Sequence, residues 1–170
     1  MVAEPENPVL ITPASFPEDR EAVATLFTEY ANTLAIDLSF QNFSEELEAL
    51  PGKYAADQGG CLFLARRTGS DSAIGCVALR PTSPPDTCEI KRLYVRSEGR
   101  GMSIGKTLLE RVIAEAKKLG YKEMLLDTLP GMSEARRLYT KFGFTEAEKY
   151  YNSPIEGTIF QRLVLTSLKS

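Results

Sequence analysis

The sequence predicts one domain of mixed α/β (α+β) type, in which helices flank a mixed β-sheet. Its 170 residues are about the size of a single compact domain. Short apolar runs typical of strands alternate with segments in which apolar residues recur at helical spacing. The middle of the chain has the order strand, glycine-bearing loop, helix and strand, which occurs in sheet proteins with flanking helices. We therefore expect a single domain over residues 1–170.

The N-terminal part of the chain predicts one strand and two helices. Val9–Ile11 is a short apolar run. Ser15 and Glu18 have the spacing of a capping box, which predicts the start of a helix, and apolar residues then recur at helical spacing as far as Leu34. A shorter helix is expected over Ser44–Leu50, where a Pro-Gly pair ends it.

The central part of the chain predicts three strands. Cys61–Ala65 and Ala73–Leu79 lie on either side of a turn cluster, so we expect them to form a hairpin. Cys88–Val95 is the third strand, and it carries three charged residues among apolar ones: Glu89, Lys91 and Arg92.

The C-terminal part predicts two helices and further strands. The first helix is expected to start at Ser103 or Ile104 and to end before Gly120, and the second covers Glu134–Phe142. The strands expected around them are Met124–Leu126, one that opens at Phe144, and Thr158–Leu165.

Charge and cysteine content narrow the class of function. Lysine and arginine total 20 and aspartate and glutamate total 23, so the net charge is −3, which argues against a general binder of nucleic acid or anionic membranes. No segment has the features of a signal peptide or a membrane helix. The spacing of Cys61, Cys76 and Cys88 matches neither a disulfide framework nor a zinc motif. We therefore expect core thiols in a cytoplasmic protein.

The chain contains no histidine. A Ser/His/Asp triad, a Cys/His dyad and any zinc site with histidine ligands are therefore excluded, and we expect no metal. A general base must be a carboxylate, a tyrosine, a lysine or a water relay.

The loop before the helix at Ile104 has the character of a phosphate-binding loop. Free backbone N–H groups and the positive end of a helix dipole attract anions, and glycine lets the backbone approach closely. A Walker loop fails here because Arg100 stands where its first glycine is required, and the spacing of Gly99, Gly101 and Gly105 misses the dinucleotide fingerprint. A nucleotide-binding P-loop protein remains the alternative that this loop leaves open.

The same loop resembles the coenzyme A pyrophosphate loop of the GNAT acetyltransferase superfamily, whose pattern is R/Q-x-x-G-x-G/A. Arg100 and Gly105 match this pattern, and Ser103 stands where its first glycine is usual. The segment from Ala135 to Phe144 also resembles the A-x-x-L-Y-x-x-x-G-F helix of the family, although Met132 replaces the asparagine that usually precedes it. The resemblance covers roughly residues 8–165 and is specific over residues 88–144.

The resemblance implies a mostly antiparallel sheet and acetyl transfer from acetyl-coenzyme A to an amine by direct attack. In this family the pantetheine arm pairs with the fourth strand, which here implies Leu93, Tyr94 and Val95. The pyrophosphate lies on the loop and the first helical turn. The residues implied there are Arg100, Gly101, Met102, Ser103, Ile104, Gly105 and Lys106.

Two side chains become candidates for proton transfer. Glu89 is the candidate base, because family members that use a side-chain base often have a glutamate in this strand; it could instead be ion-paired with Lys91 or Arg92. Tyr139 is the candidate acid that protonates the leaving thiolate, and the alternative is a tyrosine packed in the core.

The acceptor site is expected beside the first helix, at Phe27, Tyr30 and the following loop with Asp37, Phe40 and Gln41, and at Tyr151 near the last strand. Arg92 could bind a substrate carboxylate, which would imply an amino-acid-like acceptor, whereas dominance of the acidic residues would imply a polyamine or aminoglycoside.

We expect a primary amine of a small molecule as the acceptor, with protein lysines or N-termini as the alternative. A catalytically silent acyl-coenzyme A binder that regulates a partner is a further alternative. The sequence leaves the oligomeric state open; dimers are common in the superfamily, so a homodimer is one option.

Overall fold

The computed structural model describes residues 9–34 and 42–165. Its strands are β1 (Val9–Pro13), β2 (Cys61–Arg67), β3 (Ala73–Thr82), β4 (Thr87–Val95), β5 (Glu123–Thr128), β6 (Thr145–Glu146) and β7 (Ile159–Val164). Its α-helices are α1 (Arg20–Thr33), α2 (Phe43–Ala49), α3 (Ile104–Lys118) and α4 (Ser133–Lys141). Short 3₁₀ turns cover Gly52–Tyr54, Ala56–Gln58 and Ser97–Gly99.

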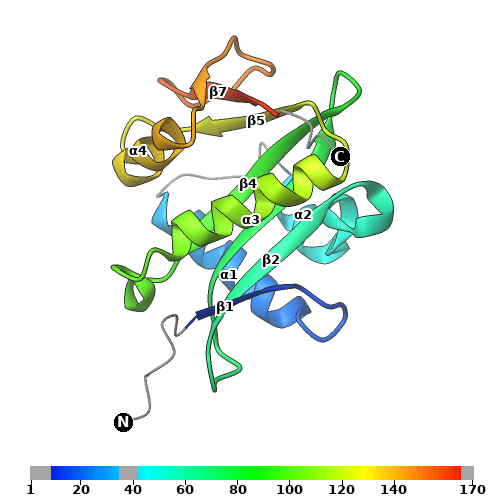
Figure 1. Ribbon diagram of the computed structural model, residues 1–170, viewed down its shortest axis with the longest axis vertical. Coiled ribbons are helices and arrows are strands. Elements are labelled where there is room, and N and C mark those ends of the chain that lie inside the picture. The colour runs from blue at the N-terminus through cyan, green and yellow to red at the C-terminus, as the bar shows by residue number, and fades with distance from the viewer. Residues whose placement is uncertain (1–8, 35–41, 166–170) are drawn as a thin grey trace.

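Within the described residues, the strands form one seven-stranded sheet in the order β1-β2-β3-β4-β5-β7-β6. Strands β4 and β5 run parallel, and the other neighbouring pairs run antiparallel. Figure 1 shows α3 lying across one face of this sheet, with α4 beside β5. The predicted mixed, mostly antiparallel sheet with flanking helices is confirmed.

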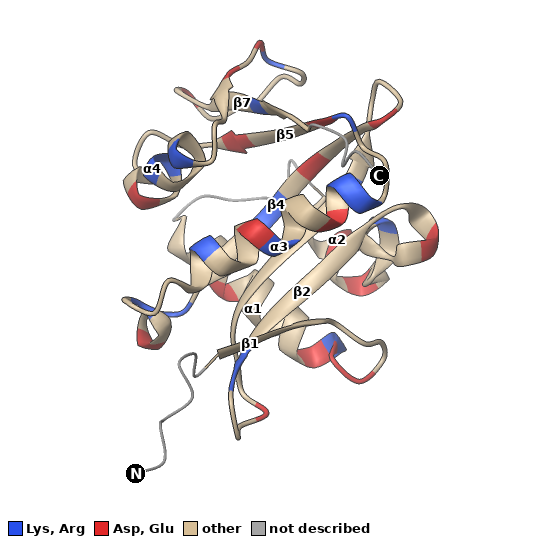
Figure 2. Cartoon of the chain, viewed as in Figure 1, with Lys and Arg blue, Asp and Glu red and all other residues tan. Residues whose placement is uncertain are grey.

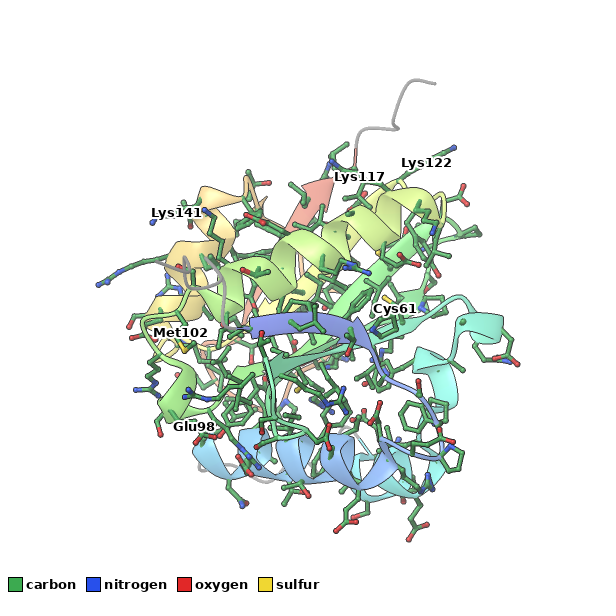
Figure 3. The ribbon with its side chains drawn as sticks, turned by 60° about the horizontal axis from the view of Figure 1, so that its bottom comes forward. Cys61, Glu98, Met102, Lys117, Lys122 and Lys141 are labelled. Carbon is green, nitrogen blue, oxygen red and sulfur yellow. The ribbon has the colours of Figure 1, made fainter. Side chains whose placement is uncertain are left out.

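Helices cover both faces of the sheet, so its central strands are apolar on both sides. In β2, Phe63 and Ala65 pack in the cluster that contains the buried face of α3, whereas Leu62 and Leu64 pack in the cluster that contains α1. Figure 3 shows the same division, with α3 and α4 on one side of the strands and α1 on the other. This two-sided burial explains why β2 and β3 read as continuous apolar runs rather than as an alternating pattern.

The start of α1 differs from the sequence prediction. The helix begins at Arg20, and the predicted capping box at Ser15 and Glu18 is wrong. The Asp19 carboxylate accepts a hydrogen bond from the Ser15 backbone N–H at 2.8 Å and is ion-paired with Arg66. These two contacts hold residues 15–19 in turns, and the helix can start only after them.

The predicted ends of α3 and α4 are confirmed. Gly120 and Gly143 follow the two helices with φ values of 89° and 95°. Glycine adopts this left-handed conformation without the steric cost that a Cβ atom would add, and it therefore ends helices efficiently.

Candidate active site

A bulge in β4 creates the space for a site. Tyr94 faces Cys76 and Lys91 faces Ala78, so Arg92 and Leu93 together lie opposite the single residue Val77. Arg92 has the left-handed φ of 61°. A bulge of this kind bends its strand. As a result β4 pairs with β5 only over its first residues, Thr87–Glu89.

Beyond the bulge, the β5-facing edge of β4 borders a cavity of about 470 Å³. Leu93, Tyr94 and Val95 line this cavity from β4, while α1, α4 and the first turn of α3 close its other sides. We call it the donor cavity. An exposed strand edge offers backbone N–H and C=O groups to an extended ligand, which can pair with it as an additional strand.

The predicted cofactor loop borders the donor cavity at two of its residues. Arg100 and Gly105 line the cavity. Ile104 is buried in the main core and Met102 packs against that core, and the exposed Lys106 lies 3.9 Å from Glu110 along α3. Figure 3 shows Met102 at the end of α3 opposite Lys117, so this is the N-terminal end of the helix, where backbone N–H groups lack helical acceptors.

Gly105 is the position where a side chain would enter the donor cavity. A Cβ atom built there would lie 3.7 Å from Leu138 Cδ2 and 3.9 Å from Val95 Cγ2, which are ordinary contact distances. The protein itself therefore has room for a methyl group at this position. Because Gly105 has no side chain, a ligand in the donor cavity can approach the backbone of the first turn of α3.

Ser103 occupies a strained position in the loop. Its φ is 56°, in the left-handed region that favours glycine. We expect Ser103→Gly to raise the free energy of unfolding by about 1 kcal/mol, because glycine adopts this conformation without steric cost. Thermal or urea unfolding checks this expectation. A variant less stable than the wild type would show that the serine side chain contributes more than its backbone strain costs.

Tyr139 lies beside a second, smaller cavity between β4 and β5. This cavity has a volume of about 40 Å³, and Asp127, Lys91 and Tyr30 also line it. The Tyr139 ring is buried and packs edge-on against Phe144, with ring centroids 5.5 Å apart. Burial raises the pKa of the Tyr139 hydroxyl, with Tyr30 and Asp127 adding to the effect, so the hydroxyl keeps its proton at neutral pH. We call this space the central cavity.

A third cavity, of about 310 Å³, lies on the other side of Lys91 and is lined mostly by charged and hydroxyl side chains. We call it the polar cavity. Figure 2 shows acidic and basic positions along the middle of β4, next to acidic positions on β5. The lining residues that carry charge or a phenol hydroxyl are Glu46, Arg80, Glu89, Lys91, Arg92, Tyr150 and Tyr151. Lys91, Arg92 and Tyr151 line both the central and the polar cavity.

Glu89 lies in the polar cavity and is firmly held. Its side chain is only 2% exposed. Arg80 contacts Oε1 through Nε at 2.9 Å and through a terminal nitrogen at 2.8 Å, and the Tyr150 hydroxyl donates to Oε2 at 2.5 Å. Glu89 is thus ion-paired, but with Arg80 rather than with the Lys91 or Arg92 expected from the sequence.

The Arg92 guanidinium is also ion-paired within the protein, with the carboxylate of Glu46. Two of its nitrogens contact the two oxygens of Glu46, at 3.1 and 3.2 Å. The guanidinium lies over the rings of Tyr30 and Phe43, and the side chain is 3% exposed. The planar fork expected to bind a substrate carboxylate therefore binds a carboxylate of the protein itself in this structure, and the substrate-binding role of Arg92 stays a prediction.

The other predicted acceptor residues separate into two groups. Tyr30 and Tyr151 line the central cavity. Phe27 is fully buried and packs edge-on against Tyr54 in the core on the α1 face, so the structure does not bring it to the site. Asp37, Phe40 and Gln41 lie outside the described residues.

Asp127 is the site residue that the sequence reasoning missed. It lies near the end of β5, accepts a hydrogen bond from the Tyr151 hydroxyl, and places Oδ1 3.9 Å from Lys91 Nζ. One sequence signal could have identified Asp127. It places a carboxylate directly after the apolar run Met124–Leu126, in a strand whose faces are both covered.

The cysteines do not join the site. Cys76 and Cys88 are buried, Cys61 is half-buried, and all three are free. Burial raises the pKa of the Cys61 and Cys88 thiols to about 12, so neither is a thiolate at neutral pH.

Within the described residues there is no group of acidic or cysteine side chains arranged to hold a metal ion. Those residues also include no helix long and apolar enough to cross a membrane.

Comparison with known proteins identifies the family. A model of the acetyltransferase (GNAT) family matches residues 21–144. The chain belongs to the GNAT family. Over 163 residues it is 39% identical to an uncharacterized N-acetyltransferase of Schizosaccharomyces pombe, a match that covers 96% of this chain and 98% of that protein.

Solved GNAT structures have the same fold. An acetyltransferase of the GNAT family from Staphylococcus aureus has a TM-score of 0.77 at 21% identity, covering 93% of this chain and 99% of that one. An acetyltransferase from Salmonella typhimurium, solved with its cofactor acetyl-CoA, has a TM-score of 0.70 at 21% identity, covering 96% of this chain and 98% of that one. This protein is therefore an N-acetyltransferase of the GNAT type.

The donor cavity has the features that acetyl-coenzyme A requires. It combines the β5-facing edge of β4, the N-terminus of α3 and the missing side chain at Gly105. A strand edge suits the amide-containing arm of the cofactor, and a helix N-terminus suits its pyrophosphate.

Proposed function

We propose that this enzyme transfers the acetyl group of acetyl-coenzyme A to the primary amine of a small molecule by direct attack. The observation that carries the proposal is that the donor, central and polar cavities lie next to one another along β4. The donor and central cavities share Tyr30, Leu93 and Met132, and the central and polar cavities share Lys91, Arg92 and Tyr151. Two substrates that enter from opposite ends would meet beside Tyr139.

The donor side would be held mainly by backbone groups. The N–H and C=O groups of Leu93, Tyr94 and Val95 would pair with the pantetheine arm, and the N–H groups from Arg100 to Lys106 would bind the pyrophosphate. This division explains why the side chains of Ile104 and Met102 can serve the core instead. Tyr94 likewise turns its hydroxyl away from the reaction site, toward Glu29 at 3.2 Å.

The acceptor side would be held by side chains. The lining of the polar and central cavities includes three cations, Arg80, Lys91 and Arg92, and three carboxylates, Glu46, Glu89 and Asp127. This balance offers no excess of negative charge for a polyamine or an aminoglycoside, and it favours a compact acceptor with a single amine. The cavity volume of about 310 Å³ also suits a small molecule.

Acetyl-coenzyme A supplies an acetyl thioester, whose acetyl carbon bonds to the amine nitrogen as its bond to sulfur breaks. Tyr139 would donate the proton that the leaving sulfur takes, because burial keeps its hydroxyl protonated. Direct attack is favoured because buried thiols with raised pKa values are poor nucleophiles for an acyl-enzyme route. Glu89, the base that the sequence predicts, already accepts hydrogen bonds on both of its oxygens, from Arg80 and Tyr150, so direct contact between this carboxylate and the amine is not favoured.

The proposal also covers the cellular location, the number of domains and the oligomeric state of the protein. Three free thiols agree with a reducing compartment, so we infer a cytoplasmic enzyme with one catalytic domain. A homodimer stays a prediction, which gel filtration with light scattering would test.

The experiment that tests the function measures thiol release from acetyl-coenzyme A with a panel of amines. The panel holds amino acids, amino-acid amides, monoamines, polyamines and lysine-containing peptides, and mass spectrometry identifies each product. We expect release with at least one small monoamine and a product heavier by one acetyl group. Preference for the peptides would instead support a protein acetyltransferase. Binding of acetyl-coenzyme A without release across the panel would support a silent regulator, and binding of ATP in its place would support a P-loop protein.

A further inference from the structure

The strongest unassigned feature of the molecule is the Asp127 carboxylate in the central cavity. Its side chain is 16% exposed, whereas the Glu89 side chain is 2% exposed. The Tyr151 hydroxyl donates to Oδ2, and Oδ1 lies 3.9 Å from Lys91 Nζ, which is beyond hydrogen-bond distance. Asp127 and Tyr139 line the same cavity. One oxygen of Asp127 thus accepts the Tyr151 hydroxyl, while the other lies at ion-pair distance from Lys91, and the residue lines the same cavity as the proposed acid.

Glu89 has a different setting, although both carboxylates belong to the polar network of the site. Glu89 lines the polar cavity but not the central cavity, and Arg80 and Tyr150 occupy its two oxygens. The Glu89 side chain is only 2% exposed, and a new ligand would have to share its oxygens with Arg80 and Tyr150. Asp127 therefore has better access to an acceptor that is positioned for reaction beside Tyr139.

We propose that Asp127 binds the ammonium group of the acceptor and takes its proton. This inference rests on the proposed function. The ammonium enters from the polar cavity and donates a hydrogen bond to Asp127 Oδ1. One N–H bond then breaks, its electron pair stays on nitrogen, and the proton bonds to Oδ1. The neutral amine can now form the bond to the acetyl carbon as the carbon–sulfur bond breaks and the sulfur takes the Tyr139 proton. The second proton that the nitrogen loses returns to the Tyr139 oxygen, and Asp127 releases the first proton to water.

The volume of the central cavity limits what can reach Asp127. Its volume of about 40 Å³ is much smaller than the 310 Å³ of the polar cavity. We therefore expect the amine end of the acceptor to reach Asp127 while its bulk stays in the polar cavity.

Several charged or titratable groups face Asp127, and they bear on how kcat/KM varies with pH. Lys91 lies beside it on β4, Tyr30 faces it from α1, Tyr139 from α4, and Tyr150 and Tyr151 from the segment before β7. Burial lowers the pKa of Lys91, and burial raises the pKa values of the tyrosines. The tyrosines therefore stay neutral at neutral pH, and Asp127 is the acidic group of the central cavity.

The test compares Asp127→Asn with the wild type over a range of pH. The probe is the unbranched primary amine that gives the fastest turnover in the acceptor panel. We expect kcat/KM for this amine to fall about 100-fold near pH 7, because the variant neither binds the ammonium nor takes its proton. The deficit should shrink as the pH approaches the pKa of the amine, about 10, where the acceptor arrives already neutral. The Kd of acetyl-coenzyme A, measured by calorimetry, should stay within about twofold.

Two further variants serve as comparisons. Asp86→Asn removes a carboxylate whose ion pair with Lys122 is exposed, and it should leave turnover unchanged. Glu89→Gln should lower kcat/KM less than Asp127→Asn does. If Asp127→Asn does not fold, Tyr151→Phe tests the same site, because loss of the hydroxyl that fixes Asp127 should raise the KM of the amine more than it lowers kcat.

The outcomes separate this inference from the proposed function. A deficit that is constant over the pH range, or a larger loss in Glu89→Gln, would overturn the role of Asp127 while leaving acetyl transfer intact. An unchanged KM for the amine in Tyr151→Phe would also overturn the role of Asp127 and leave acetyl transfer intact. A wild-type enzyme that acetylates no amine would overturn both.

Discussion

Replacing Tyr139 with phenylalanine is expected to lower kcat about 100-fold while the affinity for acetyl-coenzyme A stays close to that of the wild type. The variant loses only the hydroxyl that would protonate the leaving sulfur, a role for which losses of this order are typical. Its ring would keep the edge-on contact with Phe144, at a centroid distance of 5.5 Å. Steady-state turnover and calorimetry with coenzyme A measure the two effects separately.

Tyr121→Phe is the matched control for this variant. The Tyr121 hydroxyl donates to the Gly59 carbonyl, and Tyr121 lines none of the donor, central or polar cavities. The control should keep kcat within about twofold of the wild type. Equal turnover in Tyr139→Phe and the wild type would remove Tyr139 from the mechanism and leave it a core residue.

Replacing Gly105 with alanine is expected to move stability and cofactor affinity in opposite directions. Alanine is favoured over glycine in a helix by about 1 kcal/mol, and the new methyl group would meet its protein neighbours no closer than 3.7 Å. The variant should therefore unfold at a higher temperature. The same methyl group enters the donor cavity beside the first turn of α3, so the Kd of acetyl-coenzyme A should rise about tenfold or more.

Thermal unfolding and calorimetry on the same preparation check both parts of this expectation. The rise in stability also serves as the control, since it shows that weaker binding does not come from a damaged fold. A stabilised variant with unchanged affinity would place the pyrophosphate away from Gly105. A destabilised variant would mean that the first turn of α3 needs the conformational freedom of glycine.

The sequence predicted much of the fold because local patterns decided most of the elements. The helical spacing from Ile104 to Leu119 and the glycines after α3 and α4 correctly placed both helices. The start of α1 was wrong because two contacts of Asp19, with Ser15 and Arg66, override the local capping pattern. Arg66 comes from a strand 47 residues away, and no local pattern contains that information.

The site was less predictable, because it depends on which strands separate and which charges pair. The bulge at Arg92 and Leu93 opens the sheet, yet neither residue type signals a bulge. The partners of Glu89 and Arg92 come from β3, α2 and the segment before β7, so the sequence identified charged residues but not their pairs. The loop before α3 could be located because a local motif specifies its backbone, and its role toward the pyrophosphate stays a prediction.

The central claim is that donor and acceptor meet beside Tyr139, between the separated strands β4 and β5. A crystal structure of the enzyme with coenzyme A tests it most directly. We expect the pyrophosphate on the backbone N–H groups from Arg100 to Gly105, the pantetheine arm along Leu93–Val95, and the sulfur about 3.5 Å from the Tyr139 hydroxyl. Coenzyme A bound elsewhere, or with its sulfur outside the central cavity, would contradict the account.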